Sequence, residues 1–336
     1  MQRQDFLHKD VETKLCEHYM AAGAMCRLTT NSEQLLAAAR DTFFAIEPPE
    51  AAVDFSLRFW VEGSHNPPHS WPTPWLKPYL RGLNHLVFAG FDAKSSMLAD
   101  LHTRRVIGRF STAMAGDTGY WKMVIFPMLL SIMAGSVGLV ELHASCIAKD
   151  HRGLILAGPS RSGKSTLAMA LTKSGFRLLS DDRTFCSLAD ERLQAWGLPR
   201  PLKLRREAGT WFGEFRDREP TDLQNGERVF HFEPTQRGAP KCEPKLLVFL
   251  DRQEQRGFSI SSMDKSETRS RLEAELLAEA PDAIRKQAAP FDNLLSLPCC
   301  VLRYGGSPQE IAERLAASFL NMPECEMVSG AKWRAS

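Results

Sequence analysis

The segment that constrains the fold most is 158–165, which reads Gly-Pro-Ser-Arg-Ser-Gly-Lys-Ser and fits the pattern G-x-x-x-x-G-K-S/T. A short apolar run at 154–157 precedes it, and residues 166–174 have the composition of a helix that stops at Gly175. In a loop of this pattern, backbone N–H groups and the positive end of the following helix converge on a phosphate. The sequence therefore predicts a strand, a phosphate-binding loop and a helix, in that order.

This loop supplies the candidate ligands of a nucleotide. Lys164 is expected to reach the β- and γ-phosphates, and the hydroxyl of Ser165 is expected to bind Mg²⁺. The candidate nucleotide-binding residues are Gly158, Pro159, Ser160, Arg161, Ser162, Gly163, Lys164, Ser165 and Thr166. The pattern predicts that the chain binds a nucleotide together with Mg²⁺.

Acidic residues that follow strands are the candidates to work with this loop. Asp181 and Asp182 come directly after a strand expected at 176–180, so that one carboxylate can organise Mg²⁺ while the other accepts a hydroxyl proton. Asp251 ends a later strand but is followed by Arg252, where a motor or transport ATPase usually has a glutamate. The sequence favours the aspartate pair, with a strand end and a solvated turn as the alternative interpretation.

The block from Leu142-His143-Ala144 through the loop to Asp182 resembles the kinase domain of the HPr kinase/phosphorylase family, and its internal spacing follows the family's without a gap. These bacterial enzymes use a P-loop to phosphorylate a serine on a carrier protein. The resemblance implies that His143 and Asp182 are catalytic, with Asp182 as the proton acceptor. It also implies that Lys164 is the P-loop lysine and that Ser165 is a Mg²⁺ ligand, with Asp181 beside Asp182. The family's acidic Mg²⁺ ligand would fall near Gln194, so Asp181 is a candidate metal ligand from its position in the aspartate pair.

The same resemblance implies an α/β fold, namely a P-loop kinase domain of the HPr-kinase or PEP-carboxykinase-like type with a mixed sheet and helices. We expect this domain at 121–336. Residues 1–120 have a different texture, because the strand expected at 53–61 is apolar at every second position and a helix is expected near 32–42. They are predicted to form a small α+β domain, for which recognition of the acceptor is a candidate role.

The expected function is that of an ATP-dependent, Mg²⁺-requiring kinase that phosphorylates a serine hydroxyl of a protein or peptide. In this mechanism Asp182 takes the hydroxyl proton, and Lys164, Mg²⁺ and His143 stabilise the charge on the phosphoryl group in transfer. Two alternatives stay open: a nucleotide-gated ATP-binding module without transferase activity, and a small-molecule kinase of the same fold.

Cationic side chains cluster within 196–206. The cluster consists of Arg200, Lys203, Arg205 and Arg206. Such a cluster can hold a triphosphate or an acidic acceptor segment, and it can equally be the solvated face of a strand. Arg252 and Arg256 are, by position, the candidates for the late catalytic arginine of the family.

Charge and cysteine usage bear on partners and compartment. The 336 residues carry 42 Lys and Arg against 40 Asp and Glu, so the formal charge of +2 gives no broad attraction to nucleic acid, and no nucleic-acid partner is predicted. No two of the eight cysteines stand at C-x-x-C spacing, and the N-terminal segment lacks the apolar core of a signal peptide. These features predict the reducing cytoplasm. Whether the chain forms a homo-oligomer is left open.

One apolar run, 123–140, contains no charged residue and approaches the length of a membrane span. Pro127, Gly135 and Gly138 interrupt it, and from Leu139 it continues into an alternating pattern typical of a strand. The pattern favours a buried helix followed by a strand over a membrane span.

Overall fold

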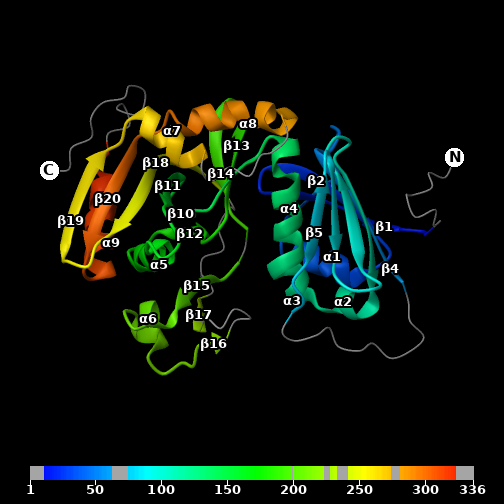
Figure 1. Ribbon diagram of the computed structural model, residues 1–336, viewed down its shortest axis with the longest axis horizontal. Coiled ribbons are helices and arrows are strands. Elements are labelled where there is room, and N and C mark those ends of the chain that lie inside the picture. The colour runs from blue at the N-terminus through cyan, green and yellow to red at the C-terminus, as the bar shows by residue number, and fades with distance from the viewer. Residues whose placement is uncertain are drawn as a thin grey trace. The chain divides into compact units, whose positions relative to one another are not determined.

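The computed structural model describes residues 11–62, 75–198, 200–222, 228–232, 241–273 and 281–322. The chain divides into two compact units: residues 1–139 with 278–286, and residues 140–277 with 287–336. The division falls between Leu139 and Val140, whereas the sequence placed it at 120/121. The difference arises because the apolar helical run belongs to the first unit. Figure 1 shows the elements of each unit.

The first unit is built on an eight-stranded mixed sheet with the order β3-β1-β2-β4-β8-β7-β6-β5. Its strands are β1 (Leu15–Ala21), β2 (Ala24–Thr30), β3 (Phe44–Ile46), β4 (Phe55–Glu62), β5 (Tyr79–Leu83), β6 (Leu86–Gly90), β7 (Ser96–Asp100) and β8 (Arg105–Ser111). The alternation predicted at 53–61 is confirmed in β4, where Phe55, Leu57 and Phe59 are buried.

Helical segments of the first unit are α1 (Glu33–Arg40), α2 (Thr112–Gly116), α3 (Thr118–Tyr120), η1 (Trp121–Ile125), α4 (Phe126–Ala134) and η2 (Gly135–Val137). The helical run Thr118–Val137 is long and apolar enough to cross a membrane by length and composition alone. Its large side chains are packed inside this unit: Trp121 is fully buried, with its ring centroid 4.7 Å from that of Phe110 and 5.7 Å from that of Phe59. The structure therefore has the buried helix that the interrupted pattern predicted.

The second unit contains a nine-stranded mixed sheet. Seven strands follow the order β12-β10-β11-β18-β14-β13-β9, and β20 pairs with both β18 and β19. These strands are β9 (Val140–Leu142), β10 (Ser145–Lys149), β11 (Arg152–Ala157), β12 (Arg177–Ser180), β13 (Thr184–Ala189), β14 (Arg192–Trp196), β18 (Lys241–Arg252), β19 (Gly257–Ser262) and β20 (Cys299–Gly305). The mixed sheet agrees with the fold class expected from the sequence at the level of an α/β architecture.

A small three-stranded sheet and several helices complete the second unit. The small sheet has the order β15-β17-β16, with β15 (Leu202–Arg205), β16 (Thr221–Asp222) and β17 (Arg228–Phe232). The helices are α5 (Lys164–Lys173), α6 (Arg206–Gly209), η3 (Gly213–Phe215), α7 (Lys265–Glu273), α9 (Pro308–Leu320) and α8 (Pro281–Leu294), whose first residues belong to the first unit.

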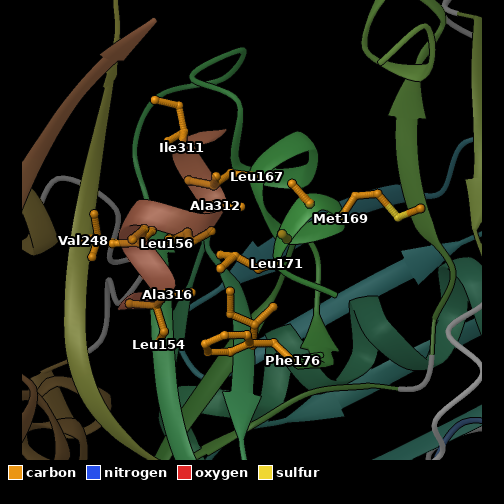
Figure 2. Close-up of a cluster of buried hydrophobic side chains, with 14 of the residues drawn as sticks. Leu154, Leu156, Leu167, Met169, Leu171, Phe176, Val248, Ile311, Ala312 and Ala316 are labelled. Atoms are coloured by element: carbon orange, nitrogen blue, oxygen red, sulfur yellow. The ribbon is translucent and has the colours of Figure 1, made fainter. Parts of the chain in front are cut away.

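Core residues of the second unit lie on both sides of the loop between β11 and α5. Leu154 and Leu156 of β11 lie in one buried cluster with Leu167 of α5 and Ile311 of α9, as Figure 2 shows. Burial of these aliphatic side chains holds α5 and α9 firmly against the sheet. The loop between β11 and α5 is therefore anchored at both ends by packed residues.

Four strands of this sheet run in the same direction. β11 is parallel to β18, β18 is parallel to β20, and β11 and β12 are both antiparallel to β10. Their carboxyl ends therefore lie at one edge of the sheet, where α/β proteins commonly bind ligands. Across the sheet, these four strands come in the order β12, β11, β18 and β20. The residues that follow them are, in the same order, Asp181, Gly158, Gln253 and Gly306.

Candidate active site

The segment 158–163 connects β11 to α5, as the sequence predicted. Gly158 and Gly163 have φ angles of +140° and +93°, which favour glycine. A Cβ atom at Gly158 would lie 3.1 Å from the carbonyl oxygen of Leu250, and one at Gly163 would collide with the hydroxyl of Tyr304. Both glycine positions of the pattern therefore have a steric reason, because atoms of β18 and β20 lie close to where a side chain would begin.

Tyr304 at the end of β20 supports this loop. Its hydroxyl donates a hydrogen bond of 2.7 Å to the carbonyl oxygen of Ser162. The side chain is buried, and burial raises the pKa of Tyr304 to about 12, so the hydroxyl keeps its proton and remains a donor. The sequence pattern did not point to Tyr304, since its neighbour in space is distant in the chain.

Lys164 lies at the first position of α5 and is 7% exposed. Its Nζ atom donates hydrogen bonds to the carbonyl oxygens of Gly158, at 2.7 Å, and Pro159, at 3.2 Å. The ammonium group is thus held against the same loop whose backbone N–H groups are expected to receive a phosphate. The nearby Ser162 hydroxyl is buried and makes no hydrogen bond within the part of the chain that the structure describes.

Asp181, just after β12, is half-buried and faces Ser165. Its carboxylate accepts hydrogen bonds from the Ser165 hydroxyl and from the backbone N–H of Lys203, the latter at 3.0 Å. Burial raises the pKa of Asp181, and these hydrogen bonds act in the opposite direction. The structure therefore brings together the two side chains that the sequence suggested as metal ligands.

Asp182 lies in a different environment from its neighbour. Its Oδ1 atom is 3.1 Å from Nε2 of His143, and the two side chains are 64% and 54% exposed. The hydrogen bond from His143 is the largest influence on this carboxyl, and with the charges of Arg183 and Arg200 it lowers the pKa of Asp182 to about 2. Asp182 is consequently ionised throughout the physiological range.

These groups line one open cleft with a volume of about 350 Å³. Its walls are formed by His143, Ser160, Arg161, Gly163, Lys164, Ser165, Thr166, Asp181, Asp182, Lys203, Leu204, Arg205, Glu207, Ala208, Trp211 and Arg252. Most of the candidate site residues face this cleft. The exceptions are Gly158, Pro159 and Ser162, which shape the loop from behind, through the contacts to Leu250, Lys164 and Tyr304 described above.

The cationic cluster divides in two. Lys203 and Arg205 line the cleft, where they alternate along β15 with the buried Leu202 and Leu204. Removal from water, together with the charge of Arg200, lowers the pKa of Lys203. Neither Arg200 nor Arg206 is among the lining residues. Half of the cluster therefore faces the site, and the strand is not simply a solvated face.

The two candidates for a late catalytic arginine are also separated. Arg252, at the end of β18, lines the cleft, and its Cδ atom lies 4.0 Å from the position a Cβ would take at Gly163. Arg256 is not among the lining residues; its side chain packs near Gly306. Of the two, only Arg252 is placed where it can reach a ligand in the cleft.

The donor set is compatible with Mg²⁺ held by a few protein ligands. Within the described ranges no group of three or more His, Cys, Asp or Glu side chains is arranged to hold a metal ion. Mg²⁺ commonly takes only one or two protein oxygens and completes its shell with water and substrate phosphates. Ser165 and Asp181 offer that number of oxygens at the mouth of the loop.

Comparison with known proteins gives a distant structural likeness. No protein-family profile and no curated protein sequence matches this chain. Among solved structures, the Hpr(Ser) kinase/phosphatase from Coxiella burnetii is similar at 12% identity over 54% of this chain and 97% of that chain, with a TM-score of 0.26. This likeness is too weak to add to the argument, so the proposals below rest on the residues of the cleft.

Proposed function

We propose that the protein is a Mg²⁺-dependent kinase that transfers the γ-phosphoryl group of ATP to a hydroxyl group, with a serine of a protein or peptide as the acceptor. The observation that carries the proposal is that two consecutive carboxylates face one cleft in different environments. Asp181 is bonded to Ser165, whereas Asp182 is bonded to His143. Different environments are what allow two carboxylates to take different roles.

The loop and Lys164 would hold the phosphates of the nucleotide. The N-terminus of α5 and the backbone N–H groups of the loop favour an anion. Lys164 would exchange its hydrogen bonds to the carbonyl groups of Gly158 and Pro159 when it turns towards a phosphate. A phosphate oxygen carries negative charge, so a hydrogen bond from the ammonium group to it is stronger than one to an uncharged carbonyl oxygen.

Ser165 and Asp181 would hold Mg²⁺. When bound, the ion would neutralise negative charge on the phosphate groups of the nucleotide. Asp181 is held in place by the backbone N–H of Lys203 as well as by Ser165, so its position does not rest on Ser165 alone. The hydrogen bond from Ser165 is the contact that must be replaced by the metal.

Asp182 would orient the acceptor hydroxyl and receive its proton. As the acceptor oxygen forms its bond to phosphorus, the bond from phosphorus to the bridging oxygen breaks, ADP leaves, and the hydroxyl proton passes to the carboxylate. A group with a pKa of about 2 is a weak base. It suits a loose transition state, in which the proton leaves late and positioning matters more than basicity. His143 fixes the carboxylate in this role.

The preference for a serine acceptor rests on the sequence resemblance, and the cytoplasmic location rests on the cysteine usage. Both remain proposals. Lys203, Arg205 and Arg252 add positive charge to the cleft walls. They are suited to stabilise charge on the transferring group or to hold an acidic segment beside the acceptor.

The test is transfer of label from γ-labelled ATP to polypeptides or metabolites of a cell extract by the purified protein. We expect label on a polypeptide. Asp182→Asn should lower the turnover by about 10²- to 10⁴-fold while the Kd of ATP changes less than about threefold. Asp251→Asn is the matched control, because Asp251 also ends a strand of this sheet but pairs with Arg303 outside the cleft lining.

The outcomes separate the alternatives. Label on a small molecule identifies a small-molecule kinase. ATP binding without any transfer identifies a nucleotide-gated module. Equal turnover by Asp182→Asn and the parent contradicts the proposed mechanism.

A further inference from the structure

Trp211 is a large aromatic side chain that lines the cleft and is not used by the proposed reaction. It is 45% exposed, although Gly209, two residues before it, and Phe212, directly after it, are buried. Gly209 packs so closely on the ring of Phe230 that a side chain there would collide with it, and Phe212 is 4% exposed in the core. Trp211 is therefore held in the open by a packed backbone, not by a loose segment.

A hydrogen bond fixes Trp211 against another helix. The Nε2 atom of Gln309, in the first turn of α9, donates a hydrogen bond of 2.7 Å to the carbonyl oxygen of Trp211. The backbone N–H of Trp211 donates to the carbonyl oxygen of Ala208 at 3.2 Å, so the chain continues the turn of α6. Ala208 also lines the cleft.

The topology places Trp211 on the side of the loop opposite the carboxylates. Asp181 and Asp182 follow β12, on one side of β11, whereas α9 follows β20, on the other side of β11. The segment from Lys203 to Trp211 crosses between these sides: it begins with the N–H bond to Asp181 and ends with the bond from Gln309. One wall of the cleft thus runs from the carboxylates to the indole ring.

A nucleotide in this cleft has a defined direction, and this step rests on the proposed function. The γ-phosphate must lie near Asp182, where the acceptor hydroxyl is oriented. The nucleoside must then leave the loop towards the other side. From these positions we propose that the base of the nucleotide stacks on Trp211 over Ala208, and that Trp211 is the binding residue for the nucleoside part of the substrate. Every base has a π-face, and indole stacking on it is favourable.

The test compares the binding of ATP with that of inorganic tripolyphosphate, both with Mg²⁺, by calorimetry on the full chain. Tripolyphosphate uses the loop but has no base. We expect Trp211→Ala to weaken ATP about tenfold and to leave tripolyphosphate within about twofold, because stacking is lost and the phosphate contacts are kept. Trp211→Phe should retain most of the affinity for ATP. Leu320→Ala is the control, because Leu320 is similarly exposed, at 47%, on α9 outside the cleft lining.

Two results would overturn this assignment. One is that Trp211→Ala leaves the ratio of the ATP and tripolyphosphate affinities unchanged, either because neither affinity changes or because both fall equally. The other is that it raises the KM for the acceptor and leaves ATP binding unchanged. Absence of ATP binding by the parent overturns both this assignment and the proposed function. ATP binding that depends on Trp211, without any phosphoryl transfer, supports this assignment and contradicts the proposed function alone.

Discussion

The Nε2 atom of His143 lies 3.1 Å from Oδ1 of Asp182. His143 follows the short strand β9 and Asp182 follows β12, which are separate strands of one sheet. The pairing keeps Asp182 ionised and points its carboxylate into the same cleft as Lys164. The aspartate that the resemblance suggested as a proton acceptor is thereby given a fixed partner.

Replacing His143 should raise the pKa of Asp182. Since the hydrogen bond from His143 is the largest influence that lowers it, we expect His143→Ala to move the value from about 2 towards the ordinary 3.8. The measurement is a carboxyl NMR titration of Asp182. Arg183→Gln is the control, with a smaller shift expected because Arg183 acts only through its charge. An unchanged titration in His143→Ala would show that the pair does not exist in solution.

The same pair should make stability depend on pH at the acid end. The pKa of Asp182 is lower in the folded than in the unfolded protein, so the unfolded state takes up the proton first as pH falls. The contribution of the pair is present above about pH 4 and is lost as pH falls to about 2. In urea titrations, the unfolding free energy of the parent should exceed that of His143→Ala above this interval, and the difference should shrink as pH falls through it. A difference that grows towards low pH would contradict this sign.

Asp181→Asn should change the requirement for Mg²⁺. If Asp181 and Ser165 share the ion, loss of the carboxylate charge should raise the Mg²⁺ concentration for half-maximal activity by about tenfold or more. Asp182→Asn should leave that concentration nearly unchanged and lower the maximal rate instead. Titration of activity with Mg²⁺ at saturating ATP measures both. Identical Mg²⁺ curves for Asp181→Asn and the parent would remove Asp181 from the metal site.

Tyr304→Phe should loosen the loop at 158–163. The variant loses the hydrogen bond to the Ser162 carbonyl and keeps the aromatic packing. We expect a loss of about 0.5–1.5 kcal/mol in unfolding free energy, measured in urea, and weaker ATP binding. Gly163→Ala should lower the unfolding free energy and weaken ATP binding more than Tyr304→Phe does, because it adds backbone strain at φ +93° to the collision with Tyr304. The double variant should recover part of the loss, since Tyr304→Phe removes the colliding hydroxyl but not the strain.

Leu156→Ala tests whether the core holds the loop. Leu156 is fully buried on β11 just before the loop, and the substitution should cost about 2–5 kcal/mol of unfolding free energy. Leu320→Ala removes similar atoms from an exposed position and should change stability by less than about 0.5 kcal/mol. Equal effects of the two substitutions in urea would contradict the packing shown in Figure 2.

Patterns within short stretches of the chain were sufficient to predict the elements around the site. The strand, loop and helix at 154–174, the alternation in β4 and the burial of the apolar helical run all appear in the structure. They depend on glycine conformation, side-chain periodicity and helix-forming composition, which act over a few residues. The position of the boundary between the two units was harder to predict from the sequence. The buried helix packs on the first sheet, and its composition does not say which sheet it covers.

The sequence by itself determined the strand, loop and helix at 154–174 and proposed the carboxylates beside them. Only the tertiary structure decided that Ser165 meets Asp181 while Asp182 meets His143, and that Lys203 and Arg252 face the cleft but Arg200 and Arg256 do not. It alone placed Tyr304 behind the loop and Trp211 in the opposite wall. The physical reason is that these contacts join strands and turns far apart in the chain, whose meeting depends on the order and direction of strands in the sheet.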